Sequence, residues 1–328
     1  MQFASLSTLL EQAKVAWEHN KKENRRIVLL HALPALGLPL VVMVINLILD
    51  AQLAGTGGLS GIGMRSTLQT IQTVLSDAIG ILLPFWQLGL IACAMGISQG
   101  HPASTQNLWE GFRRWGAALR LMLFRTMRYV AEIMCGTFLG SVLFMVTPLS
   151  NKFIRATEAI AANPEFSQAT PEELMAALTE TVGVWDILPY YLLCIAGAAF
   201  LTIPLFYKYR LSDYALIDCE KPGAFLSIRI SSQLMAGNRK KLFLLDLHFW
   251  WYYLLMLLSA VVAYGDLILP ALGVALPMSE NMALALFSFL SAIVQFIVYF
   301  FFRGRVETTY ACVYASLKEP PQGGTEDL

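Results

Sequence analysis

The sequence predicts an all-α, polytopic membrane protein with six transmembrane helices, N and C termini in the cytoplasm, and additional short amphipathic helices. The first observation is composition: 56% of the residues are hydrophobic and only 14% are charged, whereas about a quarter of a soluble domain is charged. The second is a series of apolar runs of about 20 residues, the length that crosses ~30 Å of hydrocarbon as a helix. The third is an uneven distribution of Lys and Arg between the two sides of these runs.

Residues 1–26 are predicted to form a cytoplasmic amphipathic segment and not a signal peptide, because charges are spread through the segment. Leu9, Ala13 and Trp17 recur there at helical spacing. We expect this helix to lie at the membrane surface or on the cytoplasmic ends of the other helices. A single six-helix membrane domain (27–318) and a disordered tail (319–328) would follow. The predicted spans lie at about 27–49, 70–97, 129–149, 185–207, 246–269 and 282–302.

The segments between the spans carry further helix signals. Arg128 and Glu132 are four residues apart near the start of the third span, so they can pair on one helix face. Within the long outer segment 150–184, a capping box predicts a short amphipathic helix that starts at Pro171. A cytoplasmic helix is predicted over about 222–236 and should stop at the glycine that follows.

The orientation follows from the basic residues. If both termini lie inside, the cytoplasmic segments carry 20 of the 23 Lys and Arg. The outer loops carry only Arg65, Lys152 and Arg155. Because Lys and Arg are concentrated in cytoplasmic loops, this distribution predicts six spans with both termini in the cytoplasm.

The fifth span has two possible starting points. A start at Leu242 would place the aromatic run after His248 near mid-membrane. A start near His248 would place these aromatics closer to the interface and Asp246 at headgroup level. We favour the second register because a carboxylate at headgroup level costs less than one in hydrocarbon.

Four blocks carry a family resemblance: QLGLIACAMG (87–96), LWEGFRRWG (108–116), IPLFYKYRLSDYALIDCEKP (203–222) and SSQLMAGNRKKLFLLDLHF (231–249). In this order they resemble an uncharacterised family of six-helix integral membrane proteins, found mainly in Gram-positive bacteria and classed as a domain of unknown function. That family is distantly similar to the membrane domain of some glycerophosphodiester phosphodiesterases. The chain departs from it at Leu205, where members usually have Gly, and at Lys221, where they often have Asn. The resemblance implies the fold and a bacterial plasma membrane, and it transfers no catalytic residue.

Four polar residues are candidates for an intramembrane role: Asp77, Gln87, Asp246 and Gln295. Asp246 could form a structural ion pair with nearby basic residues, or it could be a proton- or ligand-coupled acid. Gln87 and Gln295 could form hydrogen bonds across helices, or they could line a polar path. To test whether the protein is a transporter, Asp77 is the acid that we would substitute first.

Five basic residues form a candidate cytoplasmic collar: Arg113, Arg114, Arg239, Lys240 and Lys241. In the simpler interpretation the collar meets anionic lipid headgroups, as in any protein with this charge distribution. In the narrower one, the collar and the amphipathic segments 1–24 and 222–236 form a specific site for a lipid or for a membrane-protein partner.

Several function classes are disfavoured. Nucleic-acid binding is not expected, because no basic patch is interleaved with exposed aromatics. The five cysteines form no CxxC pair, and no catalytic, metal-binding or cofactor-binding motif is found. We therefore expect a non-enzymatic membrane protein without a cofactor, acting as a lipid-binding or partner-docking module at the cytoplasmic face. The alternative is a small-solute or ion transporter, although no inverted repeat is visible.

Overall fold

The computed structural model describes residues 5–53, 59–148, 150–162, 170, 182–219, 223–271, 274 and 280–318. Within these ranges the chain is helical, with turns between the helices and no strand. Five of the described helices are long and apolar enough to span a membrane. A sixth span results if the bent pair α11 (Arg239–His248) and α12 (Trp250–Ala263) is counted as one. The all-α class is therefore confirmed, and the long apolar helices fit a multipass membrane protein.

The five candidate spans lie in α2 (Lys21–Leu53), α3 (Leu59–Ser98), α5 (Trp115–Met145), α8 (Val184–Tyr209) with its continuation to Asp218, and α14 (Glu280–Val298) with its continuation to Lys318. The shorter helices before α8 are α1 (Leu6–His19), η1 (Asn107–Trp109), α4 (Glu110–Arg113) and α6 (Ser150–Ala162). Those after it are α9 (Ser212–Asp218), α10 (Ala224–Leu234), α13 (Gly265–Ala271), the π-helical turn η3 (Tyr299–Arg303) and α15 (Gly304–Lys318).

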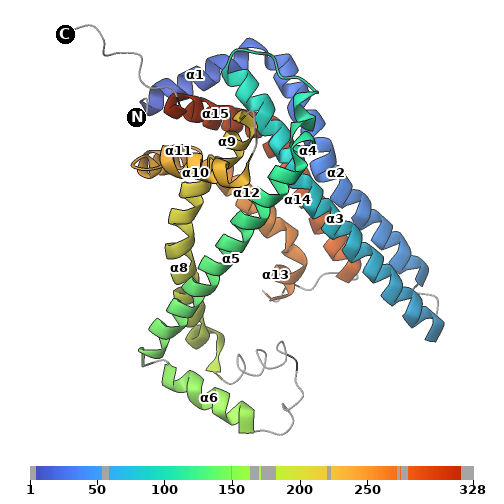
Figure 1. Ribbon diagram of the computed structural model, residues 1–328. Helices are drawn as coiled ribbons and strands as arrows, with labels where there is room; N and C mark the ends of the chain where they lie inside the picture. The colour runs from blue at the N-terminus through green and yellow to red at the C-terminus, as the bar shows by residue number, and fades with distance from the viewer. Residues whose placement is uncertain are drawn as a thin grey trace. The chain divides into compact units, whose positions relative to one another are not determined.

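The chain divides into two compact units. Unit 1 comprises Met1–Leu119 and Leu211–Leu328, and unit 2 comprises the intervening Arg120–Arg210. In unit 1, α2 runs beside α3, α12 runs beside α14, and α14 also packs on α2 (Figure 1). These contacts bring helices from the two ends of the sequence into one bundle.

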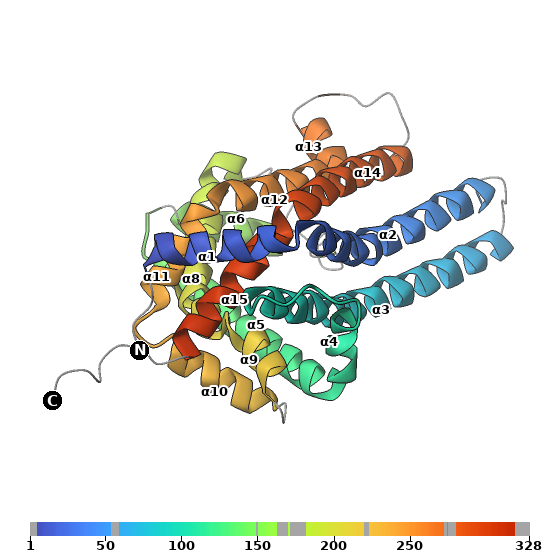
Figure 2. The same cartoon turned by 90° about the horizontal axis from the view of Figure 1, so that it is seen from above.

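The predicted N-terminal amphipathic helix is confirmed as α1. The Ser5 hydroxyl caps it by accepting a hydrogen bond from the Thr8 N–H at 3.2 Å. Its buried residues are Leu9, Ala13 and Trp17, the positions that the helical spacing had singled out. Figure 2 shows α1 crossing α15, against which it packs.

The last helix, α15, is the most enclosed helix of unit 1. It packs against α1 and α3, and it continues α14 through η3. Glu307, Thr308 and Thr309 are all buried in it. Gly304 lies directly against the Trp17 indole. A Cβ added at Gly304 would collide with that ring. A helix of mixed polarity is therefore held inside the unit by tertiary contacts.

Unit 2 is built on close packing between α5 and α8. A Cβ added to Gly136 or Gly140 would collide with the α8 backbone, and one added to Gly197 would collide with α5. Small residues at such positions let helix backbones approach, as is common in membrane proteins. Arg128 and Glu132 form the predicted i,i+4 ion pair at 2.8 Å.

Some helix boundaries differ from the predictions. The helix that contains the third predicted span, about 129–149, runs from Trp115 to Met145, so it begins well before the apolar part. Within the fifth predicted span, 246–269, the helix is interrupted at Phe249 and again at Tyr264. The segment between α5 and α8 contains α6, which was not predicted. The predicted helix starting at Pro171 and the tail 319–328 lie outside the described residues.

Candidate functional site

Three of the predicted collar residues lie together at the start of α11. Arg239, Lys240 and Lys241 occupy its first turn and are exposed. Gly237, two residues before the helix, has a φ of +80°, a conformation that glycine adopts without strain. The chain therefore turns sharply and begins α11 with three cations, at the helix end whose free N–H groups favour anions.

The same helix exposes large apolar side chains. Phe243, Leu244 and Leu247 are 50%, 53% and 54% exposed, whereas Leu242 and Leu245 are fully buried on the opposite face. A helix that anchors one face in protein and exposes a second apolar face beside cations is typical of a membrane interface. The exposed side of α11 thus combines a surface for lipid chains with charges for lipid headgroups.

The bend at Phe249 sets the direction of α11. The helix meets α12 at 67°, so it does not continue along the axis of the apolar helix that follows. Phe249 itself is buried and has φ −93° and ψ 20°, outside the helical region. The bend lies next to His248, near which the favoured register of the fifth span starts. No proline or glycine lies at the bend, so packing of the buried Phe249 produces it.

The other two collar residues behave differently. Arg113 is exposed and pairs with Glu110 at 3.4 Å. Arg114 is half-buried and donates hydrogen bonds to Glu110 at 2.8 Å and to the carbonyls of Leu216 and Cys219 at 2.8 and 2.7 Å. Arg114 therefore closes the end of α9, and three of the four exposed collar residues lie on α11.

Asp246 lies on the buried side of α11 and is held by two tyrosines. Its Oδ1 accepts hydrogen bonds from the hydroxyl of Tyr253, at 3.1 Å, and from that of Tyr310. The two hydroxyls are also 2.9 Å apart. This cluster, the Asp246 cluster, ties α11 and α12 to α15.

Gln87 belongs to a second buried group, the Glu307 cluster. The Glu307 carboxylate accepts hydrogen bonds from Gln87 at 3.0 Å and from Tyr214 at 2.5 Å, and it pairs with Arg303 at 2.9 Å. Arg303 also donates to the Tyr252 hydroxyl at 2.7 Å. The cluster thereby joins α3, α9, α12 and α15. The predicted cross-helix hydrogen bond of Gln87 is present, and its partner is a carboxylate.

The remaining two polar candidates lie elsewhere. Gln295 donates to Ser291 at 3.3 Å, and Ser291 donates across to the Ser259 carbonyl of α12 at 2.8 Å. Asp77 is exposed on α3, ten residues or about 15 Å of helix from Gln87. The structure therefore does not bring the four residues together along one path.

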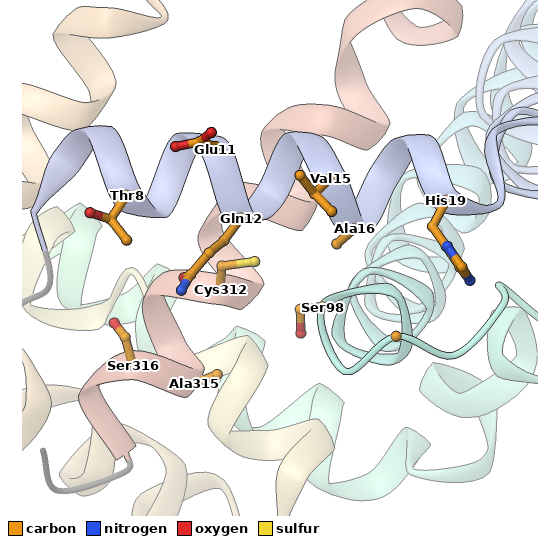
Figure 3. Close-up of a pocket in the computed structure, with 11 residues that line it drawn as sticks. Thr8, Glu11, Gln12, Val15, Ala16, His19, Ser98, Cys312, Ala315 and Ser316 are labelled. Atoms are coloured by element: carbon orange, nitrogen blue, oxygen red, sulfur yellow. The ribbon is translucent and has the colours of Figure 1, made fainter. Parts of the chain in front are cut away.

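A groove of about 810 Å³ lies between α1, α15 and the end of α3. Figure 3 shows Gln12 pointing from α1 toward Cys312 of α15, with Thr8 and Ser316 near one end and His19 and Ser98 near the other. Its lining mixes hydroxyl, amide and small apolar side chains with one carboxylate, Glu11, one imidazole, His19, and one thiol, Cys312. This surface could accept a polypeptide segment, but it carries no concentrated charge.

In the part of the chain that the structure describes, few side chains are arranged in a way that could support catalysis. No three His, Cys, Asp or Glu side chains come together as a metal site among those residues. Cys219, just after α9, has its thiol pKa raised by partial burial and by the Asp218 carboxylate. It is therefore mainly protonated near neutral pH and is a weak nucleophile there.

The sequence interpretation missed most members of the two buried clusters. Tyr253 and Tyr310 lie 7 and 64 residues from Asp246, and Gln87 lies 220 residues from Glu307. One usable signal was present: Arg303 and Glu307 have the i,i+4 spacing of a helical ion pair. No known family model, curated protein or solved structure matches the chain.

Proposed function

We propose that this protein is a non-enzymatic integral membrane protein that binds anionic lipid headgroups through α11 at the cytoplasmic face. The observation that carries the proposal is the exposed surface of α11, where three cations adjoin Phe243 and Leu247. Cations near an anionic leaflet contribute ~1 kcal/mol each. The adjacent apolar side chains contribute further binding free energy because they insert into the membrane interface.

The proposal includes a topology and a location. Six spans with both termini in the cytoplasm put α11 on the same side as most Lys and Arg. The family resemblance adds the bacterial plasma membrane as the location. In this arrangement α11 lies along the inner surface and α12 enters the hydrocarbon after the bend at Phe249.

Two alternatives are less well supported by the contacts. A transporter would need Gln87, Asp246 and Gln295 to face a path, but each is hydrogen-bonded to protein groups at a different place. A docking module for a membrane-protein partner would use the groove between α1 and α15. The charge of α11 favours lipid as the first ligand to test.

The test compares lipid binding by the purified full chain. Native mass spectrometry with added phosphatidylglycerol or phosphatidylcholine should show a preference for phosphatidylglycerol. The combined change Arg239→Gln, Lys240→Gln and Lys241→Gln should remove most of that preference. A matched control changes three exposed cations of α1 and α2 instead: Lys14→Gln, Lys21→Gln and Lys22→Gln.

The two triple variants lose the same charge, so their comparison separates a local site from a general effect. A larger loss in the α11 variant supports the proposal. Equal losses in the two variants, or unchanged binding in the α11 variant, would refute a site on α11.

A further inference from the structure

An apolar groove between α2 and α14 lies apart from α11. It has a volume of about 230 Å³ and opens on the outer surface of the two helices. Its main lining residues are apolar: Leu33, Leu36, Gly37, Leu40, Ile293 and Phe296. Both helices are among those long and apolar enough to span a membrane, so the groove lies at the depth of lipid chains.

Gly37 keeps the groove open. A Cβ added at this position would meet nothing within 4 Å, so no protein group occupies the space beside it. Glycine also costs about 1 kcal/mol relative to alanine inside a helix, and α2 contains Pro34 and Pro39 on either side of it. The hollow is lined by apolar side chains and no protein group fills the space beside Gly37, so a hydrocarbon chain is the kind of ligand that it fits.

A cation stands above one end of the groove. The Arg25 guanidinium lies over the Phe300 ring at 5.9 Å, and Phe300 stacks on Phe296 at 6.3 Å. The aromatic pair thus connects the groove wall to the charged group. Along α2, Leu33 and Leu40 lie about 12 and 22 Å beyond Arg25 at 1.5 Å per residue.

These distances match one leaflet of a bilayer. One leaflet is about 20–22 Å thick when its headgroup region is included, and Arg25 precedes the uncharged run of α2, so Leu40 lies near the midplane when Arg25 lies among the headgroups. We propose that the groove holds one acyl chain of a bilayer phospholipid whose anionic headgroup pairs with Arg25. The cation selects the headgroup, and the groove beside Gly37 takes the chain.

The experiment uses the full chain reconstituted in vesicles that contain phosphatidylglycerol with a photoreactive diazirine on its acyl chain. After irradiation, labelled peptides should include the groove residues of α2 and α14. Gly37→Leu should fill the groove and lower that labelling about tenfold, which corresponds to ~1.4 kcal/mol. The matched control is Gly80→Leu on α3, an exposed position where an added Cβ also meets nothing within 4 Å.

Two further variants test whether Arg25 selects the lipid headgroup. Arg25→Gln should abolish the preference for phosphatidylglycerol over a phosphatidylcholine probe with the same diazirine chain. Arg26→Gln, at the exposed neighbouring position, should retain it. Gly37→Ala should give an intermediate loss of labelling, and thermal unfolding of each variant checks that the fold is intact.

The results separate the possible outcomes. Equal labelling of Gly37→Leu and Gly80→Leu would show ordinary surrounding lipid only and would overturn the proposal. Equal labelling by the two probes in the unchanged protein would overturn the role of Arg25. Because the triple variant of α11 leaves this groove intact, failure of the α11 site and failure of the groove are distinguishable.

Discussion

The guanidinium of Arg303 lies 2.9 Å from the carboxylate of Glu307, four residues later, and the Glu307 side chain is almost wholly buried. A pair with the same spacing, Arg128 and Glu132, lies 2.8 Å apart on α5 with its arginine half exposed. The two pairs have the same local geometry in different surroundings. They therefore allow the effect of burial to be measured within one protein.

Glu307→Gln should lower stability much more than Glu132→Gln. The first change leaves Arg303 buried without its counter-charge, which costs ~3–5 kcal/mol. The second removes a partly exposed helical pair, for which ~0.3–0.5 kcal/mol is typical. Thermal unfolding of both variants in one detergent checks this prediction. Similar shifts in the two midpoints would mean that burial adds nothing to the Arg303 pair.

Tyr310→Phe should destabilise the protein because it removes a hydroxyl donor from buried Asp246. The expected cost is ~1–3 kcal/mol, the range for a buried group that loses a hydrogen bond. Tyr264→Phe is the control, since Tyr264 is 61% exposed. If Tyr310→Phe unfolds at the same temperature as Tyr264→Phe, Asp246 does not depend on that hydroxyl.

Gly140→Leu should disrupt the packing of α5 on α8. Its side chain would collide with backbone atoms of Leu193 and Cys194, and overpacking of this kind costs ~1–3 kcal/mol or more. Gly116→Leu lies on the same helix where an added Cβ meets nothing within 4 Å. We expect only the first variant to show a lower unfolding midpoint. A normal midpoint for Gly140→Leu would indicate that α5 and α8 can separate at little cost.

The proposed topology makes a labelling prediction. In a background in which all five cysteines are replaced by serine or alanine, Arg155→Cys should react with an impermeant maleimide added outside intact cells. Lys240→Cys should react only after the membrane is permeabilised. Both positions are exposed, so accessibility within the protein does not limit the reaction. The opposite pattern would place the termini outside.

The sequence was most informative where one helix face or one apolar run decides the structure. The spacing of Leu9, Ala13 and Trp17 predicted α1 and its buried face, and the long apolar runs predicted the membrane-length helices. These features depend on residues within a few turns of one another. They can be read from periodicity and length alone.

The buried clusters could not be predicted in the same way. Glu307 meets Gln87 and Tyr214 only because distant helices pack around α15. The bend at Phe249 likewise contains no proline or glycine that would break the helix, and it depends on tertiary packing. Periodicity in a single sequence carries no information about such pairings, so the partners of Asp246 and Gln87 emerged only in the structure.

The packing of Trp17 against Gly304 also constrains how the protein is made. About 290 residues of synthesis separate the two positions, which takes about 15–60 s at ~5–20 residues per second. Throughout this interval the apolar face of α1 exists without the helix that will cover it. The nascent chain must shelter that face on the bilayer surface or on a chaperone, and unit 1 can close only after the C-terminal helix has left the ribosome.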